Sequence, residues 1–451
     1  MLPVVTLRLA VCAAATAVLA PFVAVRWVVL VDGVLAVAAT VDWLRAPRPE
    51  RVDVGRDAPD VLTRGMTGRL VWTVTNPTRR HLRVALADEL VDALGAPTRR
   101  TTMTVPPGGR ARRGVDLTPQ RRGRFVLERV TLRVTGPWGL AARQRWRPLR
   151  HVLTVYPPFR SQAQTELRLQ RARQLQLGER TVRMHGGGME FDTLRDYTVD
   201  DEVRRIDWAA TARSPHAIVR TYQAERNQTV LLLVDCGRTM AALVGADPAV
   251  SATAVADAPG GTEGLARLEH AIDAAQAVTR LVTGMGDRVG MIAFADRVLA
   301  TVPPRNQTDQ LRHVTAQLSV IEPRLVESDY RAAFANALGR FPRRSLLIVL
   351  TELASEAATQ TLLPALGLVR RRHLAVVAAV VDPVVERWRT AAPRTVEHIY
   401  RRAAAIRALD QRAATAAQLR AVGVTVIDAV PGGLAAALCD TYLDTKAAGR
   451  L

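Results

Sequence analysis

The chain has 451 residues, and its 62 Lys and Arg residues against 42 Asp and Glu residues give a net charge of +20 at pH 7. Hydrophobic residues make up 48% of the chain, which is typical of folded proteins and excludes a wholly disordered one. Its three cysteines, Cys12, Cys236 and Cys439, exclude a disulfide scaffold and offer no paired zinc motif. We attribute the high arginine content to a GC-rich genome rather than to a binding function.

Two apolar segments predict a transmembrane helical hairpin over residues 1–45. Residues 2–25 and 27–44 are each long enough to cross the hydrocarbon core of a membrane as a helix. A cleaved signal sequence would have no second apolar segment behind it. The alternative that stays open is a single span with a surface helix. Arginines follow the second segment closely, at residues 45, 48, 51 and 56, and arginine-rich ends stay on the cytoplasmic side. We therefore expect a multi-pass protein of the cell membrane with everything after residue 45 in the cytoplasm.

Residues 51–158 alternate between apolar and polar side chains and predict a β-sandwich of Ig-like type. Turn signals rich in Gly and Pro separate the expected strands, which are 70–75, 81–86, 101–105, 112–117, 125–134 and 152–156. Nothing in this module resembles a catalytic constellation, so it is expected to be a spacer or docking module. Residues 160–227 are expected to form a linker that includes some helix.

Residues 228–446 alternate between continuous apolar runs and amphipathic helices, which predicts a doubly wound α/β domain of Rossmann type. The apolar runs predict buried strands at 230–234, 289–294, 346–350, 374–381 and 424–427. Asp235, Glu352 and Asp382 each come directly after one of these strands. Sheets of this kind bind ligands at the carboxyl ends of their strands. We therefore expect a functional site at this edge of the sheet.

Several motifs follow one another in a fixed order along the chain. They are Gly136-Pro137-Trp138-Gly139-Leu140, Gly188-Met189-Glu190-Phe191, Leu194-Arg195-Asp196-Tyr197, Arg204-Arg205-Ile206-Asp207-Trp208, Gly286-Asp287-Arg288-Val289-Gly290 and Glu327-Ser328-Asp329-Tyr330. Their order resembles the bacterial domain of unknown function 58 family. The resemblance implies a membrane-anchored protein whose C-terminal half is similar to a von Willebrand factor type A domain. It also implies an adaptor role beside a MoxR-type AAA+ ATPase.

The resemblance implies a place for a divalent cation, because type A domains often hold one with an Asp-x-Ser-x-Ser motif. Here the motif reads Asp235-Cys236-Gly237-Arg238-Thr239, so one hydroxyl is missing and a positive charge is added. The candidate ligands of a weakened Mg²⁺ site are Asp235, Thr239, Ser328 and Glu352. The alternative is a degenerate site that binds no metal, with Asp235 capping the helix that follows.

The signature segment carries charges of alternating sign around one tryptophan, and its residues are candidates for partner binding or for structural ion pairs. They are Glu190, Arg195, Asp201, Arg205, Asp207, Trp208 and Arg213. We expect salt bridges that join the linker to the α/β domain, with Trp208 in a core.

The function that the sequence predicts is a non-enzymatic membrane scaffold that binds other membrane proteins and a MoxR-type AAA+ ATPase, with no cofactor unless Mg²⁺ occupies the weakened site. One alternative is binding of nucleic acid or anionic lipid through the +20 charge. The arginines are scattered and no recognised module is present, so nucleic acid is not expected. The other alternative, a metal-dependent hydrolase, would need a base or nucleophile beside Asp235, and none stands out.

Overall fold

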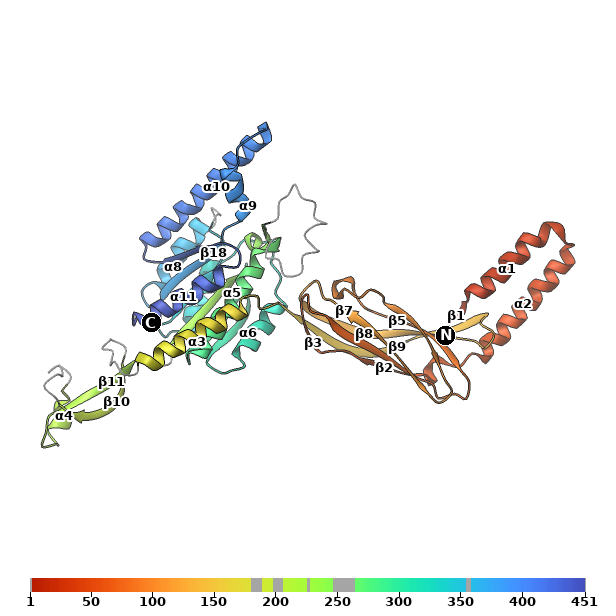
Figure 1. Cartoon of the computed structure of the whole chain (residues 1–451), viewed down its shortest axis with the longest axis horizontal. Helices are drawn as coiled ribbons and strands as arrows, with labels where there is room; N and C mark the ends of the chain where they lie inside the picture. The colour runs from red at the N-terminus through yellow and green to blue at the C-terminus, as the bar shows by residue number, and fades with distance from the viewer. Residues whose placement is uncertain are drawn as a thin grey trace. The chain divides into compact units, whose positions relative to one another are not determined.

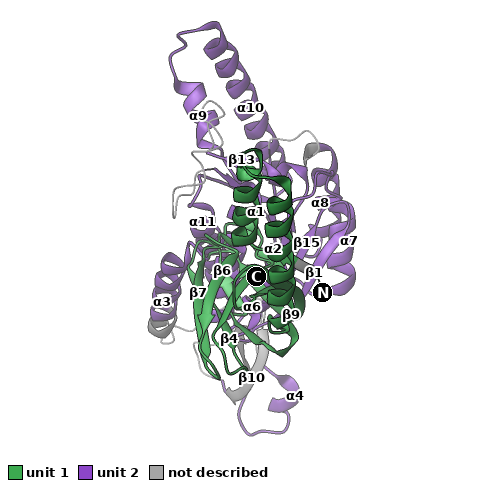
Figure 2. Cartoon of the chain, turned by 90° about the vertical axis from the view of Figure 1, so that its right-hand side faces the viewer, with its two compact units in different colours: residues 1–158 green, residues 159–451 purple. Residues whose placement is uncertain are grey.

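The computed structural model describes residues 2–179, 189–197, 206–224, 228–245, 264–353 and 358–450. The chain divides into two compact units, Met1–Pro158 and Phe159–Leu451, which Figure 2 shows in different colours. Each unit has its own hydrophobic core. Figure 1 labels many of the helices and strands of both units.

The first apolar segment does not form one long helix. It begins with β1 (Leu2–Val5), which pairs with β9 of the β-rich module, and continues as α1 (Leu7–Leu19). At about 1.5 Å per residue, α1 is about 20 Å long, which is too short for a hydrocarbon core of about 30 Å. The second segment forms α2 (Val25–Arg45). Among the described residues, only Val25–Arg51 is long and apolar enough to cross a membrane, with a mean hydropathy of 1.8. The structure thus supports one spanning helix where the sequence predicted two, because the start of the first segment is taken up by a strand.

The β-rich module consists of two sheets packed face to face. One has the strand order β1-β9-β8-β5-β6, with β3 beside β9, and the other has the order β2-β4-β7. The strands are β2 (Asp53–Asp57), β3 (Val61–Thr63), β4 (Gly68–Thr75), β5 (Leu82–Asp88), β6 (Arg100–Val105), β7 (Arg110–Leu117), β8 (Gly123–Thr135) and β9 (Ala141–Tyr156). Trp72 of one sheet and Leu132 of the other are fully buried in the same core. The module is therefore a β-sandwich.

Asp42 joins the end of α2 to the turn that precedes β9. Its side chain is fully buried and accepts hydrogen bonds from the backbone N–H groups of Trp138 (2.8 Å), Leu140 (2.8 Å) and Ala141 (2.9 Å). A Cβ atom on Gly136 would lie 2.5 Å from the Asp42 carboxyl group, so this position leaves no room for a side chain. The spanning helix is thereby fixed to the sandwich by a carboxylate with three backbone donors.

The second unit contains a sheet with the strand order β16-β15-β12-β17-β18-β19. The strands are β12 (Thr229–Asp235), β15 (Arg288–Phe294), β16 (Val298–Arg305), β17 (Leu346–Leu350), β18 (Leu374–Val380) and β19 (Thr425–Ala429). Neighbours are parallel except β16, which runs antiparallel to β15 at the edge. The five strands expected from apolar runs are confirmed. The sequence missed β16, which contains two prolines and is tolerated because it is an edge strand.

Helices cover both faces of this sheet. Leu268 of α5 and Leu438 of α11 belong to one buried cluster, whereas Phe334 of α7 and Leu419 of α10 belong to another. The main helices are α3 (Gln162–Glu179), α5 (Arg267–Gly284), α6 (Gln310–Ser319), α7 (Tyr330–Arg340), α8 (Leu363–Val369), α9 (Pro383–Thr390), α10 (Val396–Ala421) and α11 (Leu434–Ala447). The arrangement is the doubly wound α/β fold that the alternating sequence pattern predicted.

The expected linker over residues 160–227 has a definite structure where it is described. Helix α3 packs on the α/β fold, with Leu169 fully buried in its core and Arg168 bound to Asp440 at 2.8 Å. Beyond it, β10 (Met189–Asp196) and β11 (Ile218–Ala224) pair as an antiparallel hairpin that carries the short helix α4 (Trp208–Thr211). Helix α3 is therefore part of the α/β fold rather than a linker.

Candidate functional site

The candidate site lies at the carboxyl edge of the parallel sheet, at the end of the central strand β12. Asp235 is the last residue of this strand and is fully buried. Ser328 and Tyr330 reach it from the segment that leads into α7, and Thr351 reaches it from the end of β17. Three loops that are distant in sequence thus converge on one carboxylate, as the topology of a parallel sheet dictates.

Four donors surround Asp235, two on each oxygen. Oδ1 accepts from the backbone N–H of Gly237 (2.8 Å) and from the hydroxyl of Ser328 (2.5 Å). Oδ2 accepts from the hydroxyls of Tyr330 (2.9 Å) and Thr351 (2.6 Å). Burial raises the pKa of Tyr330 well above its usual value, and the nearby charge of Asp235 raises it further, so the phenol stays a donor. The carboxylate is therefore stabilised entirely by hydrogen-bond donors of the chain itself.

The hydroxyl of Ser328 occupies the space that a side chain at position 237 would need. A Cβ atom at Gly237 would overlap the hydroxyl oxygen of Ser328 and would lie 3.0 Å from the carbonyl oxygen of Val326. A serine at position 237, as in an intact metal motif, would thus compete with Ser328 for the same space. The hydroxyl that the motif lacks is therefore supplied by Ser328, which lies in a later loop of the chain.

Glu352 lies next to this cluster but is held by two arginines. It is 3% exposed and pairs with Arg267 of α5 at 2.5 Å and with Arg412 of α10. Arg412 also binds Asp428 of β19, with distances of 2.7 and 2.6 Å. Burial lowers the pKa of Arg412, but the hydrogen bonds that Arg412 donates to Asp428 and the charges of Glu352 and Asp428 outweigh it, so the pKa is raised. This ion network ties α5 and α10 to the sheet edge.

The four candidate metal ligands are not brought together. Only Asp235 and Ser328 touch each other, whereas Glu352 is engaged by arginines. Thr239 lies in a short 3₁₀ turn, where its carbonyl accepts from Arg267 at 3.3 Å. Within the described ranges, no group of three or more His, Cys, Asp and Glu side chains could hold a metal ion. Because the lone pairs of Asp235 already accept from four donors, these residues do not fit a divalent cation as arranged.

The signature residues have local roles where they are described. Asp207 caps α4 by accepting from the N–H groups of Ala209 (3.0 Å) and Ala210 (3.1 Å), and Arg213 donates to the Ala209 carbonyl at 3.1 Å. Trp208 is 68% exposed, so the expectation that it lies in a core is wrong. It sits on a four-residue helix beside the two-stranded hairpin, and no other strand in the described part of the chain extends that sheet.

The side chains of the other four signature residues lie outside the described part of the structure. Glu190 and Arg195 lie on β10, where only the backbone of these two residues is described. Asp201 and Arg205 lie outside the described residues. The expected salt bridges from this segment to the α/β fold therefore stay a prediction.

Sequence reasoning missed Tyr330, Thr351, Arg267 and Arg412 as parts of the site. Thr351 stands directly before Glu352, and Tyr330 belongs to a quoted motif, so both could have been found by asking what else lies at the strand ends. Arg412 has no such signal, because it is 60 residues from Glu352 in sequence. Only the packing of α10 brings it to the edge.

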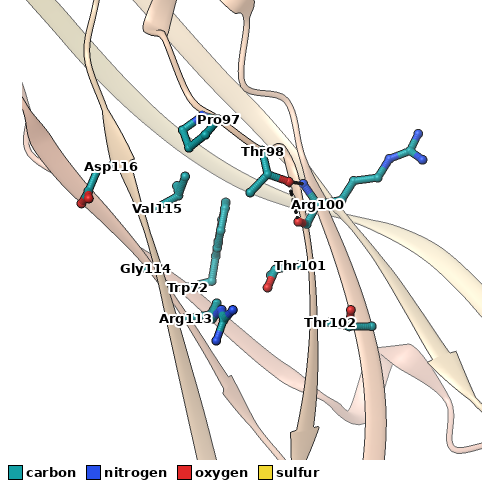
Figure 3. Close-up of a pocket in the computed structure, with 10 residues that line it drawn as sticks. All are labelled: Trp72, Pro97, Thr98, Arg100, Thr101, Thr102, Arg113, Gly114, Val115 and Asp116. Atoms are coloured by element: carbon teal, nitrogen blue, oxygen red, sulfur yellow. Dashed lines mark hydrogen bonds between the residues drawn. The ribbon is translucent and has the colours of Figure 1, made fainter.

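The β-sandwich has a pocket of about 400 Å³ of its own, shown in Figure 3. It lies beside Trp72 and is lined by Pro97, Thr98, Arg100, Thr101, Thr102, Arg113, Gly114, Val115 and Asp116. The guanidinium of Arg100 points away from the other lining residues. The polar groups of this pocket include no nucleophile paired with a base, so it adds no catalytic constellation.

Residues 193–388 match the family model described as "Protein of unknown function DUF58". An uncharacterized protein of Mycobacterium bovis and one of Mycobacterium tuberculosis are each 27% identical over 202 residues, which are 44% of this chain and 56% of theirs. The match thus spans little more than half the length of these curated relatives.

Two solved structures are similar at low scores. A CARDB domain from Pyrococcus furiosus, solved in complex with di-metal ions, has a TM-score of 0.16 and 14% identity, covering 23% of this chain and 86% of its own. Proximal thread matrix protein 1 of the mussel byssus has a TM-score of 0.28 and 10% identity, covering 50% of this chain and 47% of its own.

Proposed function

Because the chain is a DUF58 family protein, with its family match over residues 193–388, we propose that it is a membrane-anchored scaffold without enzymatic activity. Its α/β fold acts as a protein-binding domain of von Willebrand factor type A-like architecture. Its partner is a MoxR-type AAA+ ATPase, together with membrane proteins that the pair helps to assemble. The fold analogy supplies the class of function, and the site supplies the argument against catalysis.

The observation that carries this proposal is that hydrogen bonds from the chain itself occupy both carboxylate oxygens of Asp235. A catalytic or metal-binding carboxylate needs a lone pair that faces a substrate, a water or a cation. Both oxygens of Asp235 instead accept two donors each from the chain. The carboxylate therefore acts as a hub that holds three loops in a fixed shape. A rigid loop edge suits recognition of another protein.

The anchor of this scaffold is α2. Its apolar composition suits a bilayer, and the arginines that follow it favour a cytoplasmic location for the sandwich and the α/β fold. Asp42 then transmits the position of the anchor to the sandwich through its three backbone donors. The sandwich follows the anchor in the chain and serves as a spacer or docking module.

A pull-down from native membranes followed by mass spectrometry tests the proposal. The full chain is compared with residues 1–158, which contain the anchor and the sandwich but lack the α/β fold. We expect an AAA+ ATPase to be enriched only with the full chain. Equal recovery with both baits, or no ATPase with either, would refute the proposed role.

Calorimetric titration of the full chain in detergent with Mg²⁺ and Mn²⁺ tests the closed site directly. We expect no heat of binding that depends on Asp235. A site with millimolar or tighter affinity that disappears in the Asp235→Asn variant would revive the metal-dependent alternative.

A further inference from the structure

The N-terminal half of α10 (Val396–Ala421) extends away from the sheet, with α9 beside it, as Figure 1 and Figure 2 both show. Its C-terminal half is different, because it packs on the sheet through residues such as Leu419 and Arg412. The helix thus has a base that belongs to the core of the α/β fold and a projecting arm.

The arm exposes a regular apolar stripe. Val396, Ile399 and Ile406 are 69%, 57% and 39% exposed, and Ala403 is exposed between them. Their spacing of three, four and three residues places them on one line along the helix, as at the a and d positions of a heptad. Apolar residues that repeat at a and d positions are what packs one helix against another in a coiled coil. We call these four residues the seam.

The seam is separate from the face by which α10 is held. Ala405, Arg412 and Leu419 are spaced by seven residues each and are buried, while Arg401 lies 5.7 Å from the ring of Trp388 of α9. These residues form the inner face of the helix. The seam lies on the other side, so the intramolecular packing of α10 leaves it uncovered.

The charges beside the seam select its occupant. Arg402 and Arg407 are exposed and stand at the g and e positions that flank it, and neither has an acidic partner among the described residues. In a parallel pair of identical helices, Arg402 would face Arg407 of the second copy, which repels self-association. Carboxylates at the corresponding positions of a different helix would be attracted to both.

We propose that the seam is the docking site for an amphipathic helix of a partner protein that carries acidic residues beside its apolar stripe. This inference deepens the proposed scaffold function by naming the chemistry of a partner, and it rests on that function only in requiring a protein partner. The interface is a two-helix seam in which the isoleucines supply affinity and the arginines supply specificity. The narrow stripe with an alanine at its centre suits close helix contact better than insertion into lipid.

Binding of a synthetic probe to the full chain in nanodiscs of phosphatidylcholine tests the proposal. The probe is a fluorescent four-heptad helix with Leu and Ile at a and d and Glu at e and g, and the control probe carries Lys at e and g. We expect anisotropy to report binding of the Glu probe and not of the Lys probe. The double variant Ile399→Asp/Ile406→Asp should bind the Glu probe about 100-fold more weakly, since each buried isoleucine contributes at least about tenfold.

Two further variants distinguish the seam from a general charge effect. Gln411→Asp/Gln418→Asp adds the same charge to exposed positions off the seam of the same helix and should bind the Glu probe like the wild type. Arg402→Glu/Arg407→Glu should lose the Glu probe and gain the Lys probe. All six substituted side chains are exposed, so thermal unfolding should match the wild type in each variant.

Three results would overturn the inference. One is binding of the Glu probe that the Ile399→Asp/Ile406→Asp variant retains, or no binding at all. Another is a dimer of the wild type that this variant converts to a monomer, which would make the occupant a second copy. The third is association with added phosphatidylserine vesicles that the variant loses while neither probe binds, which would make the occupant a membrane. Probe binding needs no ATPase. A failure of the seam proposal can therefore be distinguished from a failure of the proposed ATPase partnership.

Discussion

Substituting Gly237 by serine restores the sequence of an intact metal motif, and the structure predicts that this damages the site. The new Cβ would overlap the Ser328 hydroxyl, and the carbonyl oxygen of Val326, at 3.0 Å, limits movement on another side. Ser328 would have to turn away and would lose its 2.5 Å hydrogen bond to Asp235. The motif-restoring change is therefore expected to remove a donor from the carboxylate rather than to create a ligand.

The magnitude follows from two terms. Overpacking a buried position costs about 1–3 kcal/mol, and losing a hydrogen bond to a charged group costs about 1.5–3 kcal/mol, so Gly237→Ser should destabilise by about 2.5–6 kcal/mol. At about 2 °C per kcal/mol for a large domain, the Tm of the α/β fold should fall by about 5–12 °C. Thermal unfolding of the full chain in detergent, followed by circular dichroism, measures this shift. Gly339→Ser is the matched control, because a Cβ there meets nothing within 4 Å.

Removing the opposing hydroxyl should reverse most of the loss. In Gly237→Ser/Ser328→Ala the overlap disappears, and the serine introduced at position 237 can donate to Asp235 instead, so the double variant should recover at least about half of the lost stability. Mg²⁺ should not raise the Tm of either variant. A Gly237→Ser protein as stable as the wild type, a double variant no better than the single one, or a Tm that rises with Mg²⁺ would show that the four-donor description of Asp235 is wrong.

Three other perturbations test buried polar groups elsewhere. Asp42→Ala should destabilise the first unit by about 3 kcal/mol because three N–H groups lose a charged acceptor. Hydrogen exchange at Trp138 should become faster, with a smaller effect for Asp42→Asn, and unchanged exchange would contradict this. Burial, aided by nearby arginines, lowers the pKa of His270 to about 4. An unfolded histidine titrates near 6.5, so stability should fall by up to about 3 kcal/mol as pH drops from 6.5 to 4, and urea titrations of His270→Gln should show a flatter pH dependence. Lys446→Met should cost about 3 kcal/mol in chemical denaturation by leaving the fully buried Asp287 without its 2.5 Å cation partner, and Asp287→Asn/Lys446→Met should regain stability if the lost charge pairing is the cause.

The strands of the α/β fold could be predicted because they are buried on both faces. Residues 230–234 and 346–350 are continuous apolar runs, as is typical of strands that are buried on both faces of a parallel sheet. In the sandwich, by contrast, β9 was recognised only near its end. Its first half carries Arg145 on an exposed position and Arg147 on a half-buried one, and a half-solvated strand with long basic side chains has no strong apolar signal.

The length of the anchor could not be settled from hydropathy. Residues 2–25 are apolar enough for a span, yet β1 uses the first of them to extend the sheet of the sandwich. The sequence of an apolar segment does not indicate whether the segment will contact lipid or pair with a neighbouring strand. That choice depends on the free edge of β9, which exists only after the sandwich has folded.

From the sequence alone we could predict the alternation of strands and helices, the position of Asp235 at a strand end and the loss of one hydroxyl from its motif. What replaces that hydroxyl is visible only in the folded protein. Ser328, Tyr330 and Thr351 reach Asp235 because parallel strands bring their carboxyl ends together, whatever their separation along the chain. A sequence motif shows which polar groups are present. Whether the lone pairs of its carboxylate remain free for a ligand depends on how the neighbouring loops pack. For this carboxylate, the neighbouring loops supply the donors that a cation would otherwise replace.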